Sequence, residues 1–203
     1  VIDHGLGFDE THFAPYKIDT TTVTEGASNV VDSGTHSVSE ATDPDYTQTF
    51  SANCPDGSIT LAPGDDETCT ITNEEKPSKL IVNKVVINHG GSKDIVDFPL
   101  FVDAISVASG DENTFDSGNH TVSETSDPDY IQTFSDDCDI NGDVTLVPGT
   151  TKTCTITNDD IAPTVTLTKV VTNDNGGATG ENSFGLTIGG TPVNSGQTLP
   201  VTA

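Results

Sequence analysis

The chain has 203 residues and a formal net charge of −25 at pH 7, from 32 acidic side chains against 7 lysines and no arginine. Nucleic acids and anionic membranes are bound by cationic side chains, so this balance argues against both as partners. No apolar run approaches the roughly 18 residues needed to span a bilayer. An aromatic content of 5% argues against an α/β enzyme with a large core.

The acidic residues are spread through loops between segments of alternating apolar residues, which indicates a solvated acidic surface rather than disorder. The chain begins without Met and without a signal peptide. We therefore expect a mature or partial piece of a longer polypeptide.

Short β-strands are the regular elements that the sequence predicts. They are rich in Val, Ile and Thr and are bounded by Gly, Pro, Asn or Asp; in chain order the clearest fall at 79–87, 121–124, 131–134, 144–147 and 153–158. Asn141-Gly142 is typical of a two-residue hairpin, because a type I′ turn needs two residues that tolerate positive φ. No window has the pattern of a long amphipathic helix.

The sequence repeats with a period of about 85 residues. Residues 32–73 and 116–158 are identical at 27 of 42 positions once one residue is inserted after the first Cys, and 166–177 echoes 80–91. We expect a first repeat at 1–76 that lacks its opening strand, a complete repeat at 77–161, and the first half of a third at 162–203.

Each repeat has the strand spacing of a small β-sandwich, so the predicted fold class is all-β, with tandem Ig-like or prealbumin-like sandwiches. A unit of this size buries little core and usually needs a covalent staple.

The four cysteines form one pair per repeat, and the partners are 15 and 16 residues apart. This placement predicts the disulfides Cys54–Cys69 and Cys138–Cys154, as in small domains of oxidising compartments. A zinc site would need four close ligands, which one pair without nearby His cannot supply. The predicted location is therefore extracellular or at the cell surface.

Strand phase predicts a second staple. A period of two puts Lys84, Glu124 and Asn158 on the apolar faces of their strands. Three polar groups aimed into a small core are costly unless they meet. If they meet, a neutral Lys amine could attack the Asn side-chain carbonyl while Glu shuttles the proton, which forms a Lys–Asn isopeptide bond. The alternative is a Lys84–Glu124 salt bridge with Asn158 as a hydrogen-bonding cap.

The order of a Lys in the first strand, Val-Ser-Glu in the middle and Thr-Ile-Thr-Asn at the end resembles the collagen-adhesin B-type, or SpaA-like prealbumin-fold, repeats. That family builds stalks of surface adhesins and pilins and forms autocatalytic intramolecular isopeptide bonds. The resemblance implies that Lys84 is the amine, Asn158 the acceptor and Glu124 the proton shuttle. The disulfide departs from the pattern, and the other repeats carry partial sets: Glu40 and Asn73, and Lys169.

Other candidate residues favour plainer interpretations. Asp137, Asp139 and Asn141 imitate the start of a calcium loop, but Pro148 stands where the loop needs Glu, so a turn is favoured. We expect no cofactor and no metal. No Ser/His/Asp set recurs between the repeats, so we expect no enzyme.

The predicted function is a structural repeat array in an extracellular stalk or filament. The alternative is an adhesin whose repeats bind a glycan or matrix ligand, for which Tyr46 and Tyr130 are the recurring exposed candidates. The expected partners are flanking repeats or neighbouring copies. One route to a filament is donation of strand 164–171 to the first repeat of the next copy, so that Lys169 meets Asn73; the competing source is residues continuous with Val1.

Overall fold

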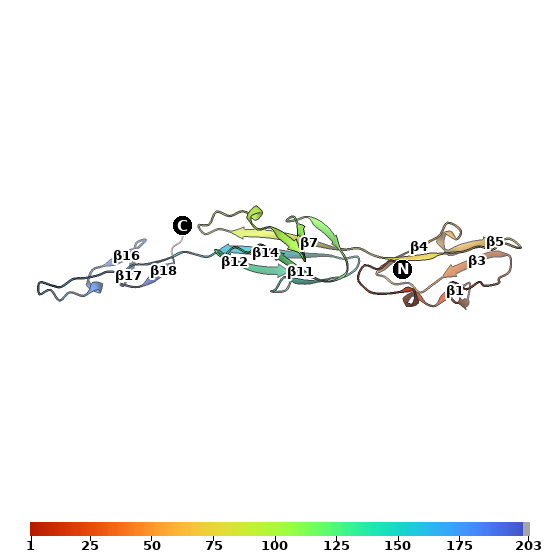
Figure 1. Cartoon of the computed structure of the whole chain (residues 1–203), viewed down its shortest axis with the longest axis horizontal. Coiled ribbons are helices and arrows are strands. Elements are labelled where there is room, and N and C mark those ends of the chain that lie inside the picture. Colours follow the sequence, from red (N-terminus) through yellow and green to blue (C-terminus); the bar gives the residue numbers. More distant parts are fainter. Residues whose placement is uncertain (201–203) are drawn as a thin grey trace.

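The computed structural model describes residues 1–200 and confirms an all-β fold. Its strands form three groups along an elongated chain (Figure 1), namely an amino-terminal group (residues 2–75), a middle group (78–160) and a carboxy-terminal group (164–200). Short 3-10 helices occur at η1 (Glu10–Phe13), η2 (Pro55–Gly57), η3 (Ile95–Asp97) and η4 (Glu181–Ser183). Among residues 1–200, no helix is long and apolar enough to cross a membrane.

The middle group consists of two four-stranded sheets. One has the order β10-β7-β14-β12 and the other β13-β11-β8-β9. The strands are β7 (Ser78–Ile87), β8 (Leu100–Val102), β9 (Ile105–Val107), β10 (Glu112–Phe115), β11 (Gly118–Glu124), β12 (Tyr130–Asp136), β13 (Asp143–Leu146) and β14 (Thr151–Asp160). Both sheets contribute to one apolar core, formed by Leu80, Val82, Leu100, Val102, Val122, Cys138, Val144, Leu146, Cys154 and Ile156.

The first and last strands of the middle group are adjacent and parallel. β7 pairs with β14 over nine residues, from Lys79 opposite Thr151 to Ile87 opposite Asp159. Along β7 the buried positions alternate from Ser78 to Lys84, as expected when one face of a strand covers a core. This pairing decides where the polar residues of the core lie.

The amino-terminal group has the same plan without most of the opening strand. One sheet has the order β2-β1-β3-β5, and a second pair consists of β4 and β6; their bounds are β1 (Tyr16–Ile18), β2 (Thr21–Val23), β3 (Gly34–Ser39), β4 (Tyr46–Phe50), β5 (Ser58–Leu61) and β6 (Ile71–Glu75). Ile2 forms a parallel bridge with Glu74, in the place where Ile87 pairs with Asp159 in the middle group. Val38 and Ile71 are only half-buried, whereas Val122 and Ile156 are fully buried.

The carboxy-terminal group consists of two strand pairs. β15 (Thr164–Thr166) pairs with β18 (Thr198–Pro200), and β16 (Leu186–Ile188) pairs with β17 (Thr191–Val193). All three residues of β15 are exposed. The first three residues of the segment expected to be donated to another copy, 164–171, therefore pair within their own group in this structure.

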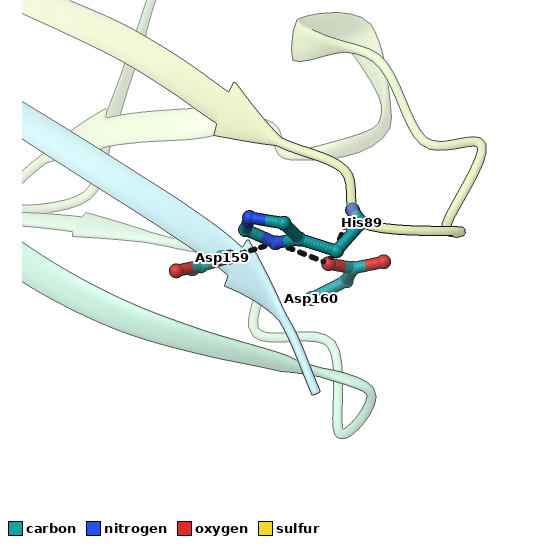
Figure 2. A group of neighbouring side chains, drawn as sticks. All are labelled: His89, Asp159 and Asp160. Carbon is teal, nitrogen blue, oxygen red and sulfur yellow. Dashed lines mark hydrogen bonds and ion pairs between the residues drawn. The ribbon is translucent and has the colours of Figure 1, made fainter. Parts of the chain in front are cut away.

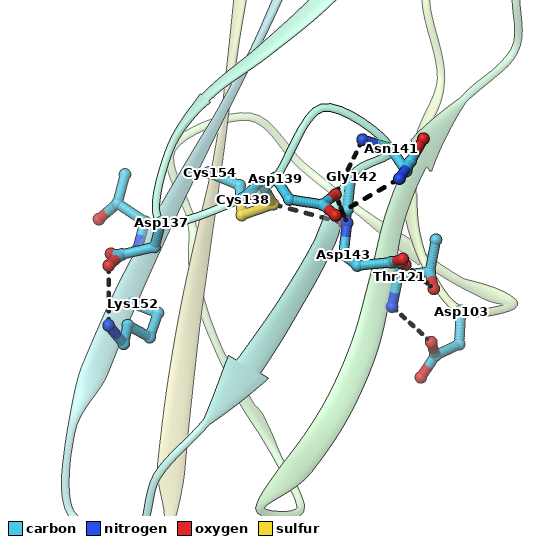
Figure 3. Close-up of a disulfide and its surroundings, with 11 residues drawn as sticks. Asp103, Thr121, Asp137, Cys138, Asp139, Asn141, Gly142, Asp143, Lys152 and Cys154 are labelled. Carbon is cyan, nitrogen blue, oxygen red and sulfur yellow. Dashed lines mark hydrogen bonds and ion pairs between the residues drawn. A yellow bond between two sulfur atoms is a disulfide. The ribbon is translucent and has the colours of Figure 1, made fainter.

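The expected hairpin at Asn141-Gly142 is wrong. β12 and β13 lie in different sheets, so the segment between them is a crossover rather than a hairpin. Of the pair, only Gly142 has positive φ, at 87°. The Asp139 carboxylate organises this turn by accepting hydrogen bonds from the backbone N–H groups of Asn141 and Asp143, at 2.8 and 2.9 Å (Figure 3).

Both predicted disulfides are present in the structure, Cys54–Cys69 and Cys138–Cys154. Cys138 follows the end of β12 and Cys154 lies in β14, so the bond fastens the crossover to the last strand (Figure 3). Cys54 and Cys154 are fully buried. The Cys138–Cys154 disulfide thus belongs to the core of the middle group, whereas Cys69 of the other bond is half-buried.

Replacing Cys138 and Cys154 together by Ala should lower the free energy of unfolding of the middle group by about 3 kcal/mol, because a loop of this size is no longer closed. Hydrogen exchange of the β13 and β14 amides measures the stability of the middle group separately from that of the other groups. The matched change at Cys54 and Cys69 should leave those amides unaffected. Equal effects of the two pairs on the middle group would contradict the assignment of each staple to its own core.

Candidate crosslink site

Three strands bring Lys84, Glu124 and Asn158 into the core of the middle group. Lys84 comes from β7, Asn158 from β14 in the same sheet, and Glu124 from the end of β11 in the facing sheet. The side chains of Lys84 and Glu124 are 0% exposed, and Lys84 Nζ lies 2.7 Å from Glu124 Oε2. Asn158 is 1% exposed. The inward phase predicted for all three residues is confirmed.

The strand register puts Lys84 within reach of Asn158. Lys84 is opposite Ile156, and Asn158 is opposite Val86, so the two residues lie on one face, two positions apart along adjacent strands. Neighbouring strands are about 4.8 Å apart and each residue advances about 3.3 Å. A lysine side chain is long enough to span this diagonal, with Glu124 approaching from the other sheet.

Phe98 and Ser109 support the lysine, and sequence reasoning missed both. The Lys84 ammonium lies 4.6 Å from the centre of the Phe98 ring, a cation–π contact. The backbone N–H of Lys84 donates to Ser109 Oγ at 2.9 Å. The sequence held a signal for both, because Phe98 and Ser109 recur as Phe184 and Ser195 in the next repeat.

Burial lowers the pKa of Lys84, and the hydrogen-bonding and Coulombic effects of Glu124 oppose that change. Removing an ammonium from water disfavours its charged form. The neutral amine, which is the nucleophilic form, is therefore more accessible at Lys84 than at an exposed lysine.

The polar atoms of the site have few partners. Lys84 Nζ and Glu124 Oε2 have only each other, as an ion pair at 2.7 Å, while Glu124 Oε1 and Asn158 Oδ1 are buried without a hydrogen-bond partner within the described residues. A buried polar atom without a partner costs about 1–3 kcal/mol. Such atoms are rare in folded proteins, and a cluster of them requires an explanation.

The carboxy-terminal partial set is arranged as in the middle group, whereas in the amino-terminal set Glu40 accepts hydrogen bonds that Glu124 does not receive from any described residue. In the amino-terminal group, Asn73 Nδ2 donates to Glu40 Oε1 at 2.6 Å and Gln48 Nε2 donates to the same oxygen at 2.9 Å. In the carboxy-terminal group, Lys169 Nζ lies 4.8 Å from the centre of the Phe184 ring, and the Lys169 backbone N–H donates to Ser195 Oγ at 3.0 Å.

The calcium candidate is not brought together as a site. Asp137 pairs with Lys152 at 2.8 Å and accepts the Thr153 N–H, whereas Asp139 accepts the N–H groups of its own turn. Figure 3 shows the two carboxylates facing different neighbours. Lys152 and the backbone hydrogen bonds lower the pKa values of these two carboxyl groups.

The expectation that both tyrosines are exposed is wrong. Tyr46 is buried and packs edge-on against Phe13, with ring centres 5.0 Å apart, and its hydroxyl donates to Asp3 Oδ1 at 2.7 Å. Tyr130 is half-buried and packs in the same way against Phe98. Each ring closes the end of its core because its apolar body is buried while its hydroxyl finds a partner.

Comparisons with protein-family models, curated proteins and solved structures find no match to this chain. The assignment of function therefore depends on the geometry of the site.

In an Asn158→Ala background, in which no Lys–Asn bond can form, replacing Lys84 by Met should lower the free energy of unfolding of the middle group by about 3–5 kcal/mol, because Glu124 is then buried without a partner. Adding Glu124→Leu should restore most of that loss, since an apolar pair of similar volume needs no compensation. Urea unfolding followed by circular dichroism measures the free energy of unfolding of both variants.

Lys79→Met is the matched control, because Lys79 pairs with Glu112 at the surface, where both side chains are more than two-fifths exposed. It should cost less than about 1 kcal/mol. A double variant no more stable than Lys84→Met alone would show that the two charges are not coupled.

Proposed function

We propose that this chain is a structural repeat array of an extracellular stalk or filament, stapled by its two disulfides and by an isopeptide bond between Lys84 and Asn158. The observation that supports it most is the buried set of Lys84, Glu124 and Asn158 between the first and last strands. The two disulfides are compatible with an extracellular protein. The resemblance to SpaA-like repeats is part of this proposal.

The crosslinking step uses only groups of the chain. The neutral amine of Lys84 attacks Cγ of Asn158, and the new C–N bond replaces the bond to the side-chain NH₂. Glu124, protonated, polarises the carbonyl, gives its proton to the departing nitrogen, which leaves as ammonia, and takes up the proton that the attacking nitrogen loses. The product is a neutral amide, so the step also removes the buried charge of the lysine.

The direction of the strands supports a role for the middle group in carrying tension along the chain. The chain runs into the middle group at Ser78, the start of β7, and leaves it at Asp160, the end of β14. Because the two strands are parallel, these points lie at opposite ends of the pair, and tension on the chain shears it. A bond from Lys84 to Asn158 would carry this load past residues 85–157, including the disulfide.

As partners we propose flanking repeats of the same polypeptide. The parallel bridge between Ile2 and Glu74 supports an opening strand that is continuous with Val1. Donation of 164–171 by another copy has less support, because β15 already pairs with β18. Direct binding of a glycan or matrix ligand also has less support, because Tyr46 is buried.

The intact mass of the folded chain, measured after reduction of the disulfides, should be about 17 Da below the sequence mass, because ammonia is lost when the amide forms. A digest should then contain the β7 and β14 peptides joined through Lys84 and Asn158. Glu124→Gln, which removes the proton shuttle and keeps the shape, should restore the full mass. Lys79→Ala, the control at a surface lysine, should keep the deficit.

Full mass in the folded wild-type chain would reject the crosslink. Lys84–Glu124 would then act as a buried salt bridge capped by Asn158.

A further inference from the structure

A second group of side chains lies where β14 ends. His89, in the loop after β7, meets Asp159 and Asp160, the last two residues of β14 (Figure 2). His89 Nδ1 lies 3.0 Å from Asp159 Oδ1 and 3.2 Å from Asp160 Oδ1. One atom from each residue lies within 4.8 Å of the others. We call these three residues the His89 cluster.

Backbone hydrogen bonds hold the Asp160 carboxylate of this cluster in place. Asp160 Oδ1 accepts the His89 N–H at 2.7 Å, and Oδ2 accepts the Gly91 N–H at 2.6 Å. The Asp160 side chain is only 8% exposed. Gly91 permits this approach, because a Cβ at that position would lie 2.4 Å from the Tyr130 hydroxyl. The position of the Asp160 carboxylate relative to the His89 loop is therefore fixed by the backbone.

In the other carboxylate, the oxygen that faces the histidine accepts no hydrogen bond from a described residue. Asp159 Oδ1 is buried and accepts no hydrogen bond of acceptable geometry within the described residues, although it faces His89 Nδ1. The rest of the Asp159 side chain is in contact with water, since the side chain as a whole is 48% exposed. A buried carboxylate oxygen of this kind is poorly stabilised by the protein alone.

From this geometry we propose that the His89 cluster binds a divalent transition-metal ion of the zinc class. Zinc bonds to imidazole nitrogen and carboxylate oxygen are about 2.0–2.2 Å long, so tetrahedral ligands lie about 3.3 Å apart. The two nitrogen–oxygen distances differ from that value by a few tenths of an ångström. Water would supply the fourth position, as in sites with three protein ligands.

The ligand types select the metal. Calcium takes six to eight oxygen ligands, whereas the His89 cluster offers a nitrogen and two carboxylates. Binding requires the imidazole tautomer with its proton on Nε2, which leaves the Nδ1 lone pair for the metal. Two carboxylates neutralise the charge of the ion.

The site would tie the end of β14 to the loop that follows β7, next to residues 161–163, which lead into β15. The equivalent residue in the amino-terminal group, His4, does not form such a cluster, since its Nδ1 faces Asp116 at 3.7 Å. His120 pairs with a single carboxylate, Asp103, at 2.9 Å. His4 and His120 therefore serve as controls for the role of His89 in metal binding.

Calorimetric titration of the full 203-residue chain with ZnCl₂, in excess CaCl₂ to saturate weak acidic sites, should give one strong site. His89→Gln and Asp159→Asn should each weaken zinc binding by about tenfold or more. Each removes a direct ligand, and even the loss of a residue that only hydrogen-bonds to a ligand costs about 10–100-fold in affinity. His4→Gln and His120→Gln should leave the affinity unchanged. Long-range ¹H–¹⁵N spectra should report the metal on Nδ1 of His89.

Circular dichroism confirms that each variant is folded, since neither His89→Gln nor Asp159→Asn touches the core. No strong zinc site in the wild-type chain would overturn the proposal. Zinc binding that survives His89→Gln, or that is lost in His120→Gln, would overturn it as well. None of these outcomes depends on the Lys84–Asn158 bond, because the mass deficit is measured separately.

Discussion

The parallel pairing of β7 with β14 determines how the middle group is held together. It places the first and last strands side by side, so the two ends of the chain segment are joined by a continuous hydrogen-bonded ladder. It also aligns the buried faces of the two strands, which puts Lys84 and Asn158 on a common diagonal. Glu124 reaches them only because the second sheet packs on that same face.

Burial in this arrangement removes the charged groups of Lys84 and Glu124 from water, which costs free energy. An ammonium and a carboxylate taken out of water lose several kcal/mol each, and their attraction repays that loss only with good geometry and further hydrogen bonds. Here Lys84 Nζ and the Glu124 oxygens have no further hydrogen bonds within the described residues. The proposed conversion of the pair into an amide and a neutral acid would remove that cost. The Phe98 ring lies against the ammonium end of the lysine.

Much of this site was predictable from strand phase, because period two assigns each residue to a face without knowledge of the loops. The disulfides were predictable from their equal placement in two repeats. Other features depend on tertiary contacts that no local pattern encodes. The turn at Asn141-Gly142 looked like a hairpin, yet β12 and β13 belong to different sheets. Tyr46 looked exposed after its turn, but packing against Phe13 buries it.

The His89 cluster was missed for a related reason. His89 is separated from Asp159 and Asp160 by about 70 residues of sequence, and only the register of β7 on β14 brings them together.

The partial sets show which part of the site each half of a repeat specifies. Lys169 has its aromatic and serine neighbours although the carboxy-terminal group has only its first strands. Asn73 and Glu40 form their hydrogen bond although the amino-terminal group has only Ile2 in the place of the opening strand. The surroundings of the Lys are therefore determined by the first strands of a repeat, and those of the Asn and Glu by the later ones. In the middle group the register of β7 on β14 brings the two parts of the site together.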